Sequence, residues 1–497
     1  MTPPWSARAE QAERSLAQGQ AAHAAALLEG ASADPAAPIQ AVRLQARSLL
    51  ALDRRLAACA ALRRLCELQP ASAVAEHNLA ATLGDAGDAQ GSHDAARRAL
   101  SKGGDAPETW LVLGRALTAL SRLDEAEAAL RESLARRPHG VDALRDLAQL
   151  VWMRDGDADA ALAVLDAALA APEASEALAA VRGQTAREIA GERVAYSGLE
   201  PFLARPHGVG LALAACAAAA EFDPKLALVH ARRAVEAGPE DHGARTALFA
   251  ALLAAGQTEE ALAGLDSFLL RAPFDQYAVS LRLVAWRLLE DPRALSPADY
   301  RRLTSALDLE TPEGQVRDQW LAEAAAGLRR LHPFRAKPLG QSIRAGVQAA
   351  LDPRFSGDAA VAAVFDALPR PISAYVAAMA GRDDPMSRRA GSDFEIVGAW
   401  SVRLTAGGRH ADHVHPRGWV SSALYVETPE PSPDKPKAGW LRFGACRLGV
   451  GLELPPEHWI EPKPGRVALF PSWMWHGTEP FTGGGERLTV AFDVQPR

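Results

Sequence analysis

The residues best suited to chemistry are histidines near the C-terminal end. Five of the 13 histidines lie among the last 98 residues, from Trp400 on. Three of these fall in the run His410-Ala-Asp-His-Val-His-Pro416, in which His413 and His415 are two positions apart. Residues i and i+2 of a strand share a face, so both imidazoles can approach one metal ion. The spacing therefore predicts a metal site.

A third histidine, His476, can complete such a site from a distant part of the chain. It follows the expected strand Arg466–Phe470 and a Pro-Ser turn. Three protein ligands leave open positions on a metal for other molecules. Eleven residues later Arg487 begins the last expected strand, and Thr489 shares its face. A guanidinium beside a hydroxyl can hold a small dicarboxylate.

Short strands separated by glycine and proline are expected to position these side chains. In the last strand, Leu488, Val490 and Phe492 face one way, and Thr489 and Asp493 the other. Several strands within about 100 residues predict a small antiparallel sandwich or barrel. The expected strands are Phe394–Leu404, Val420–Val426, Gly439–Phe443, Arg466–Phe470 and Arg487–Val494.

These C-terminal residues resemble a known family. In order and spacing they look like a 2-oxoglutarate- and Fe(II)-dependent oxygenase, and more narrowly like bacterial oxygenases in which helical repeats precede that domain. With the segment that begins Gln341-Ser-Ile-Arg-Ala-Gly, the resemblance covers residues 332–497. The pieces that carry it are His413-x-His-Pro, Tyr425, Gly439-Trp-Leu-Arg-Phe443, Pro464-Gly465, Phe470-Pro-Ser, His476 and Arg487-Leu-Thr-Val-Ala-Phe-Asp493.

The resemblance implies a double-stranded β-helix, or jelly roll, that binds Fe(II) and uses 2-oxoglutarate and O2 to hydroxylate a substrate. It places His413 at the first ligand position and His476 at the distal one. It also places Arg487 at the clamp for 2-oxoglutarate, helped by Thr489 and Tyr425.

The sequence departs from the family at the carboxylate ligand, where His415 stands. Three interpretations stay open. His415 binds iron and gives a three-histidine site, or it lies behind the site while water or another group completes the iron coordination. Alternatively His410 and Asp412, which have the family spacing by themselves, are the ligands, and His413 and His415 orient them. His458, in an expected loop, is interpreted as a bystander.

Roughly the first 275 residues show a different pattern, a helical repeat of about 34 residues. Small residues let two helices approach closely, and proline ends the second helix. The pattern resembles the tetratricopeptide family, whose arrays bind peptides or protein segments, or act as spacers or dimerisation arms. The stretch Glu176–Ala204 fits poorly and predicts an irregular helical pair. The clearest unit contains Pro107, Trp110, Leu113, Gly114, Leu117, Ala126, Leu130 and Pro138.

The predicted fold is therefore multidomain. An all-α tetratricopeptide superhelix spans residues 1–275, a helical linker 276–331 and an oxygenase-like domain 332–497. Two prolines and a glycine within Leu331–Gly340 mark the last boundary. The oxygenase-like domain is expected to have a helical preface and a β core at about 391–497.

Composition and charge narrow the classes of function. The net charge of −7 argues against a general nucleic-acid binder. No stretch of about 18 apolar residues predicts a membrane span. The start of the chain lacks the pattern of an export signal, so the cytoplasm is the expected compartment. Four scattered cysteines argue against a disulfide scaffold and against a zinc ribbon.

The hypothesis that joins both parts is that the repeats recruit a protein or peptide, which the C-terminal domain hydroxylates. It rests on architecture alone. Three alternatives stay open: a non-catalytic repeat scaffold with a degenerate β domain, a small-molecule hydroxylase of a biosynthetic pathway, and a cupin-like metal enzyme that does not use 2-oxoglutarate.

Overall fold

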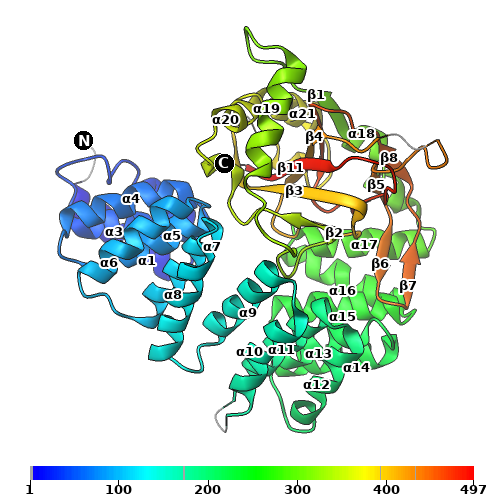
Figure 1. The fold of residues 1–497 in the computed structure, drawn as a ribbon, viewed down its shortest axis with the longest axis horizontal. Coiled ribbons are helices and arrows are strands. Elements are labelled where there is room, and N and C mark those ends of the chain that lie inside the picture. Colours follow the sequence, from blue (N-terminus) through cyan, green and yellow to red (C-terminus); the bar gives the residue numbers. More distant parts are fainter. Residues whose placement is uncertain (1–3, 172–173, 392, 431–432, 497) are drawn as a thin grey trace. The chain divides into compact units, whose positions relative to one another are not determined.

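The computed structural model describes residues 4–171, 174–391, 393–430 and 433–496, with helices first and strands last along the chain (Figure 1). Packing divides the chain into two compact units, Met1–Leu147 and Ala148–Arg497. The division falls inside one helix, so the predicted borders at 275 and 331 stay predictions. Among the described residues, none of the helices combines the length and apolarity that crossing a bilayer requires.

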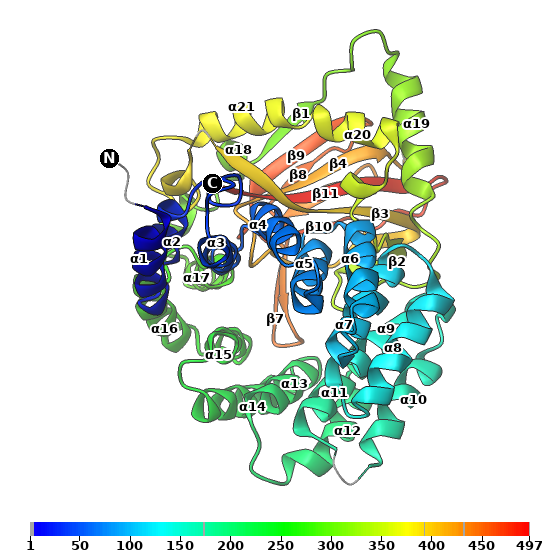
Figure 2. The same ribbon diagram turned by 90° about the vertical axis from the view of Figure 1, so that its left-hand side faces the viewer.

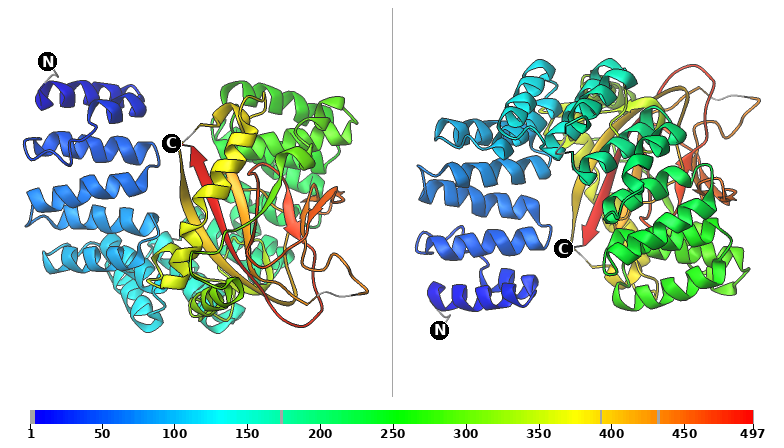
Figure 3. Two further views of the ribbon diagram at one scale, coloured as in Figure 1. Left: turned by 90° about the horizontal axis from the view of Figure 1, so that it is seen from above. Right: turned by 90° about the horizontal axis from the view of Figure 1, so that it is seen from below.

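The first unit is built from antiparallel helix pairs that stack side by side (Figure 3). Alanines such as Ala96 and Ala126 are fully buried where the helices meet, which lets neighbouring backbones approach closely. Its helices are α1 (Trp5–Ala17), α2 (Ala21–Leu27), α3 (Ile39–Ala51), α4 (Arg55–Leu68), α5 (Ala73–Asp85), α6 (Ala89–Ser101), α7 (Pro107–Ala119), α8 (Leu123–Arg136) and the start of α9 (Val141–Asp155).

The second unit continues with helices of the same kind before its strands begin. Asp223, Asp241 and Asp275 each accept a hydrogen bond from a backbone N–H of the helix that follows, which fixes where these helices start. The helices are α10 (Ala158–Leu169), α11 (Glu176–Ile189), α12 (Glu192–Leu203), α13 (Val209–Ala219), α14 (Pro224–Ala237), α15 (His242–Ala254), α16 (Thr258–Arg271) and α17 (Gln276–Leu288).

The stretch Glu176–Ala204, where an irregular helical pair is expected, forms the pair α11–α12, and Pro201 lies inside α12. A Cβ atom on Gly183 would lie 2.7 Å from Leu199, just as one on Gly114 would lie 2.8 Å from Leu130. Both contacts join residues 16 positions apart, so the same close approach recurs. The match is hard to see in the sequence because a charged residue, Arg182, stands at the position of Leu113, where it forms an ion pair with Asp166.

This close approach predicts a cost for any side chain at position 183. Gly183→Val is expected to lower the free energy of unfolding by about 1–3 kcal/mol, because added atoms displace the buried Leu199. Gly210→Val in α13 is the matched control, since nothing lies within 4 Å of a Cβ at that position. Urea denaturation followed by circular dichroism measures both. Equal losses of stability in the two variants would contradict the tight α11–α12 contact.

The strands form one large and two small antiparallel sheets. The six-stranded sheet has the order β1-β9-β4-β11-β3-β2, and the small sheets are β10-β5-β8 and β6-β7. The strands are β1 (Ser305–Asp308), β2 (Ile343–Gln348), β3 (Phe394–His410), β4 (Val420–Glu427), β5 (Leu441–Phe443), β6 (Cys446–Leu448), β7 (Leu452–Leu454), β8 (His458–Ile460), β9 (Arg466–Pro471), β10 (His476–Thr478) and β11 (Arg487–Pro496).

Further helices lie along one face of the six-stranded sheet (Figure 2). Buried Trp320, Val361 and Ile372 belong to one core with sheet residues such as Leu424 and Val490. These helices are α18 (Tyr300–Leu303), α19 (Arg317–Arg329), α20 (Ala359–Asp366) and α21 (Pro369–Met379), with 3-10 turns at Pro292–Leu295, Pro353–Phe355 and Ser387–Arg389.

The fold-class prediction, a helical repeat array followed by an antiparallel β domain with a helical preface, is confirmed. Each of the five expected strands is present, although β3 runs on to His410. The segment 276–331 differs from the helical linker that was predicted, because its strand β1 pairs with β9 and closes that edge of the sheet.

Candidate functional site

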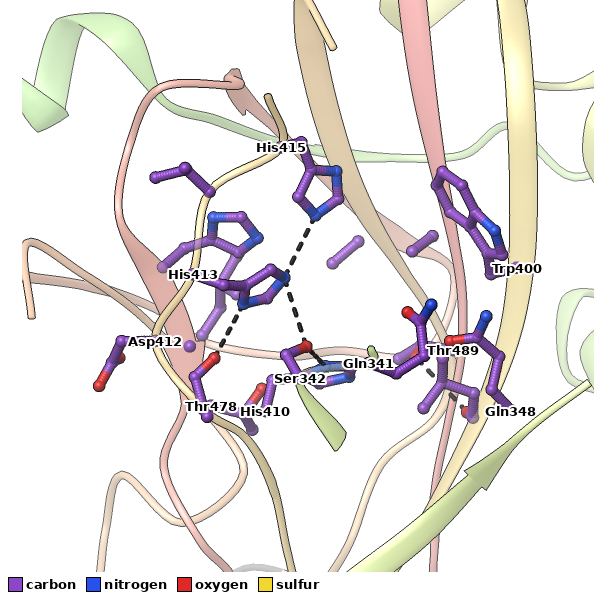
Figure 4. Close-up of a pocket in the computed structure, with 18 of the residues that line it drawn as sticks. Gln341, Ser342, Gln348, Trp400, His410, Asp412, His413, His415, Thr478 and Thr489 are labelled. Atoms are coloured by element: carbon purple, nitrogen blue, oxygen red, sulfur yellow. Dashed lines mark hydrogen bonds between the residues drawn. The ribbon is translucent and has the colours of Figure 1, made fainter. Parts of the chain in front are cut away.

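A pocket of about 610 Å³ opens inside the second unit, between the six-stranded sheet and the small sheet that contains β10 (Figure 4). Strands β3, β4, β5, β10 and β11, together with the segment 411–417 that follows β3, supply most of its wall. The segment Gly340–Ser342 and two residues of α11, Arg187 and Glu188, line it as well. The repeat-type helices of this unit therefore contribute directly to the pocket.

Backbone pairing brings two distant histidines together. The N–H of His413 donates to the carbonyl of His476 at 2.9 Å, and the N–H of His476 donates back at 3.0 Å. The N–H of His415 donates to the carbonyl of Ser472 at 3.0 Å. His413 and His415 thus lie in an extended segment after β3, and not within a regular strand as expected. Alternation still puts both on the pocket side.

Each of these three imidazoles is held by its Nδ1 atom. The acceptors are carbonyl or carboxylate oxygens, which cannot donate, so Nδ1 carries the hydrogen, and in the neutral ring Nε2 keeps its lone pair. Such partners fix the orientation of metal-binding histidines. The Nδ1–oxygen distances are 2.8 Å from His413 to Ala411, 2.9 Å from His476 to Met474 and 2.7 Å from His415 to Asp493.

The free nitrogens converge. One ring nitrogen of each of His413, His415 and His476 lies within 4.8 Å of the others. The Nε2 atoms of His413 and His415 are 3.2 Å apart, a distance that suits a hydrogen bond when His415 is protonated and a shared metal ion when it is neutral. A metal ion about 2.1 Å from both would hold them about 3.0–3.4 Å apart. The three side chains can therefore hold a metal ion.

Burial sets the protonation of this cluster. It lowers the pKa of His413 to about 3 and the pKa of His476 well below its ordinary value. Burial also acts on His415, but the charge and hydrogen bond of Asp493 outweigh it and raise the pKa of His415. His413 and His476 are therefore neutral near pH 7, as metal ligands must be.

The rival ligand pair has other partners. The carboxylate of Asp412 accepts two hydrogen bonds from Arg442, at 2.9 and 2.6 Å. It points away from the imidazoles of His413 and His415 (Figure 4). His410 lines the pocket, and its Nδ1 atom lies 2.9 Å from the hydroxyl of Ser342. The structure therefore brings His413, His415 and His476 together and leaves Asp412 outside this histidine cluster, although Asp412 lines the same pocket. Which residues bind iron stays a prediction.

Arg487 lies deep in the same pocket. It is 1% exposed and forms no ion pair among the described residues, and its Nε atom lacks a hydrogen-bond partner. Its guanidinium carbon lies 5.1 Å from the ring centroid of Tyr425, and burial lowers its pKa. Arginine nevertheless stays charged in proteins. A buried cation without an anion is costly, so this position favours an anionic ligand.

The two predicted helpers of Arg487 lie in different surroundings. Thr489 lines the pocket, and its hydroxyl donates a long hydrogen bond, 3.5 Å, to the carbonyl of Val402. Tyr425 is fully buried beside Arg487 but does not line the pocket. Tyr425 can therefore support Arg487, and a direct contact with a co-substrate stays a prediction.

Sequence reasoning gave no role to three residues that the structure brings to the site: Asp493, Ser342 and Arg442. For Asp493 a signal was present, since it shares the strand face of Thr489. Ser342 and Arg442 act across chain separations of 68 and 30 residues, which local patterns do not reveal. His458, expected to be a bystander, stacks on Tyr300 and lies outside the pocket.

Comparisons with known proteins match both parts of the chain. Residues 398–493 match the family model described as "Putative 2OG-Fe(II) oxygenase". Residues 77–134 and 111–177 match the model described as "Tetratricopeptide repeat". No curated protein matches the chain. The two family resemblances are thus confirmed, each for its part of the chain.

Two solved structures are similar to parts of the chain. One is a tetratricopeptide repeat protein from Parabacteroides merdae, with 13% identity, a TM-score of 0.36, and coverage of 49% of this chain and 97% of that chain. The other is a prolyl-4-hydroxylase from Pseudomonas putida, with 20% identity, a TM-score of 0.26, and coverage of 40% of this chain and 96% of that chain.

Proposed function

Because the chain joins tetratricopeptide repeats to a 2-oxoglutarate/Fe(II) oxygenase-like domain, we propose that it is a dioxygenase that hydroxylates a protein or peptide recruited by the repeats. One observation carries the proposal. The buried and unpaired Arg487 shares a pocket with the converging nitrogens of His413, His415 and His476. Three histidines that can hold a metal ion and an anion-binding position in one pocket are what an iron- and 2-oxoglutarate-dependent enzyme needs.

In this proposal His413, His415 and His476 hold Fe(II) through their Nε2 atoms. Arg487 and Thr489 bind the far carboxylate of 2-oxoglutarate by charge and by hydrogen bonding. When bound, the metal and 2-oxoglutarate supply the O2 chemistry that hydroxylates a substrate and releases succinate and CO2. Asp493 fixes the ring of His415 through its Nδ1 hydrogen, as a second layer of support around the metal site.

The role of the repeats rests on two supports. Tetratricopeptide arrays generally bind protein segments, and their small residues and stacked helices give them an extended surface. In the second unit, α11 of the helical array borders the pocket with Arg187 and Glu188. A segment held on these helices would lie beside the site of reaction.

Succinate formation tests the proposal. The purified full chain with Fe(II), 2-oxoglutarate and O2 is expected to form succinate, slowly without substrate and faster with it. Replacing Fe(II) by Mn(II) should retain 2-oxoglutarate binding and stop succinate formation. A scaffold with a degenerate β domain would bind no 2-oxoglutarate and form no succinate in either case, and that result would refute the proposal.

A further inference from the structure

We propose that the mouth of the pocket is a carboxylate-binding site that selects acidic peptides. This inference rests on the proposed function for its place in the reaction, because the acidic peptide would be the segment offered for hydroxylation. The binding step itself depends only on side chains of this chain and can be measured without iron.

Three arginines line the pocket in addition to Arg487: Arg187 of α11, Arg344 of β2 and Arg417 of the segment between β3 and β4. None of them forms an ion pair with another described residue. The Nε atom of Arg187 is buried without a hydrogen-bond partner. Arg344 donates only to backbone carbonyls, those of Gln341 and Ile343, at 3.3 and 2.9 Å. These guanidinium groups are available to an anion.

The acidic residues of the pocket do not neutralise these arginines, because each already has partners. Glu188 accepts from the ammonium group of Lys337 at 2.9 Å and from the N–H of Gly340 at 2.7 Å. Asp412 is bound by Arg442, as described above. Asp493 accepts from His415 and, at 2.8 Å, from Ser421. The pocket therefore keeps an excess of positive charge.

The mouth is also held in shape before any ligand arrives. Met153 in α9 accepts backbone hydrogen bonds from Arg335 and Ala336, at 2.9 and 3.1 Å. Trp152 donates to the carbonyl of Lys337 at 3.0 Å. With the contacts of Glu188, helices α9 and α11 fix the segment that leads into β2. A ligand bound there loses less free energy to ordering the protein.

The same segment reaches the histidine cluster. Ser342 directly follows the anchored residues, and its hydroxyl lies 2.9 Å from Nδ1 of His410 and 3.4 Å from Nε2 of His413 (Figure 4). Arg187 is next in sequence to Glu188, and Arg344 comes two residues after Ser342. The two arginines therefore lie on either side of the short connection from α11 to the histidine cluster. An acidic side chain held by them would bring its own peptide to the reacting position.

A peptide that carries carboxylate side chains fits the mouth of the pocket better than a nucleic acid or a small dicarboxylate does. The guanidinium fork matches a carboxylate with two parallel hydrogen bonds. A nucleic acid would be repelled by a chain with a net charge of −7. A small dicarboxylate would bind to Arg487 at the bottom of the pocket. It would then leave Arg187, Arg344 and Arg417 without an anionic partner.

Fluorescence anisotropy with a labelled peptide of alternating aspartate and glycine tests the proposal on the full chain. Arg187→Gln and Arg344→Gln are each expected to weaken binding by about 10-fold or more, since each removes charged hydrogen bonds. Added salt should weaken binding to the unaltered chain. Arg301→Gln is the matched control, because Arg301 is exposed on α18 of the same unit and does not line the pocket.

Three results would overturn the inference. The first is equal binding of a peptide in which asparagine replaces aspartate. The second is unchanged binding in both pocket variants, or an equal loss in Arg301→Gln. The third is tight binding of a phosphoserine peptide without binding of the aspartate peptide, which would point to a phosphate site. Acidic-peptide binding without any succinate formation would instead refute the proposed dioxygenase activity and leave the carboxylate site standing.

Discussion

His476→Ala is expected to lower the affinity of the chain for Fe(II) by more than ~100-fold, because loss of a mere partner of a ligand already costs about 10–100-fold. His476 is the ligand candidate from β10, and its side chain is 5% exposed inside the pocket. Without its Nε2 atom only two converging nitrogens remain. The measurement is the iron content after anaerobic loading and gel filtration, and succinate formation should fall with it.

The same experiment separates the three interpretations of the ligand set. If His413, His415 and His476 bind iron, His413→Ala and His415→Ala lose it as His476→Ala does. Asp412→Asn is the matched control and should retain iron, because the carboxylate of Asp412 is bound by Arg442. Loss of iron in Asp412→Asn, with iron retained in His415→Ala, would show that the rival pair is the correct one.

Asp493→Asn tests the support of His415 and should have a smaller effect than loss of a ligand. The amide of asparagine can still accept from Nδ1 through its oxygen, but it brings no charge. Iron affinity is expected to fall by about 10-fold or somewhat more. This graded series distinguishes a ligand from a residue that only orients one.

Local patterns in the sequence predicted the elements of the site well. Alternation in β11 placed Arg487 and Thr489 on one face, and both line the pocket. The spacing of His413 and His415 predicted that both side chains lie on the same side of an extended backbone, and in the structure both face the pocket. These predictions succeed because side chains alternate between the two faces of an extended backbone, and this alternation depends only on neighbouring residues.

Contacts between distant residues could not be predicted in this way. Nothing near Glu188 indicates that it holds Gly340, 152 positions away, or that α11 borders the pocket. Strand β1 was also missed, since Ser305-Ala-Leu-Asp308 is short and becomes a strand only because β9 offers it an open edge. Such features depend on how separate helices and strands pack together, and the local pattern of hydrophobic residues does not reveal that packing.

Arg487→Met is expected to have two effects of opposite sign. It should weaken 2-oxoglutarate binding by about 100-fold or more, because a buried charged hydrogen-bonding group is lost. It should also raise the stability of the ligand-free chain by about 1–4 kcal/mol, because an apolar side chain replaces a buried cation without an anionic partner. Thermal unfolding with and without Mn(II) and 2-oxoglutarate measures both effects.

Weaker binding of 2-oxoglutarate together with higher stability of the ligand-free chain is expected only if Arg487 binds a ligand. An arginine that served only the fold would destabilise the chain when removed, since its packing and its contact with Tyr425 would be lost. An arginine that binds an anion destabilises the empty site and stabilises the filled one.

Thr489→Val is the matched control on the same strand face, and it should weaken 2-oxoglutarate binding far less than Arg487→Met does, because no charge is removed. A variant Arg487→Met that keeps its affinity for 2-oxoglutarate would show that the co-substrate lies elsewhere and would remove the main support of the proposed activity.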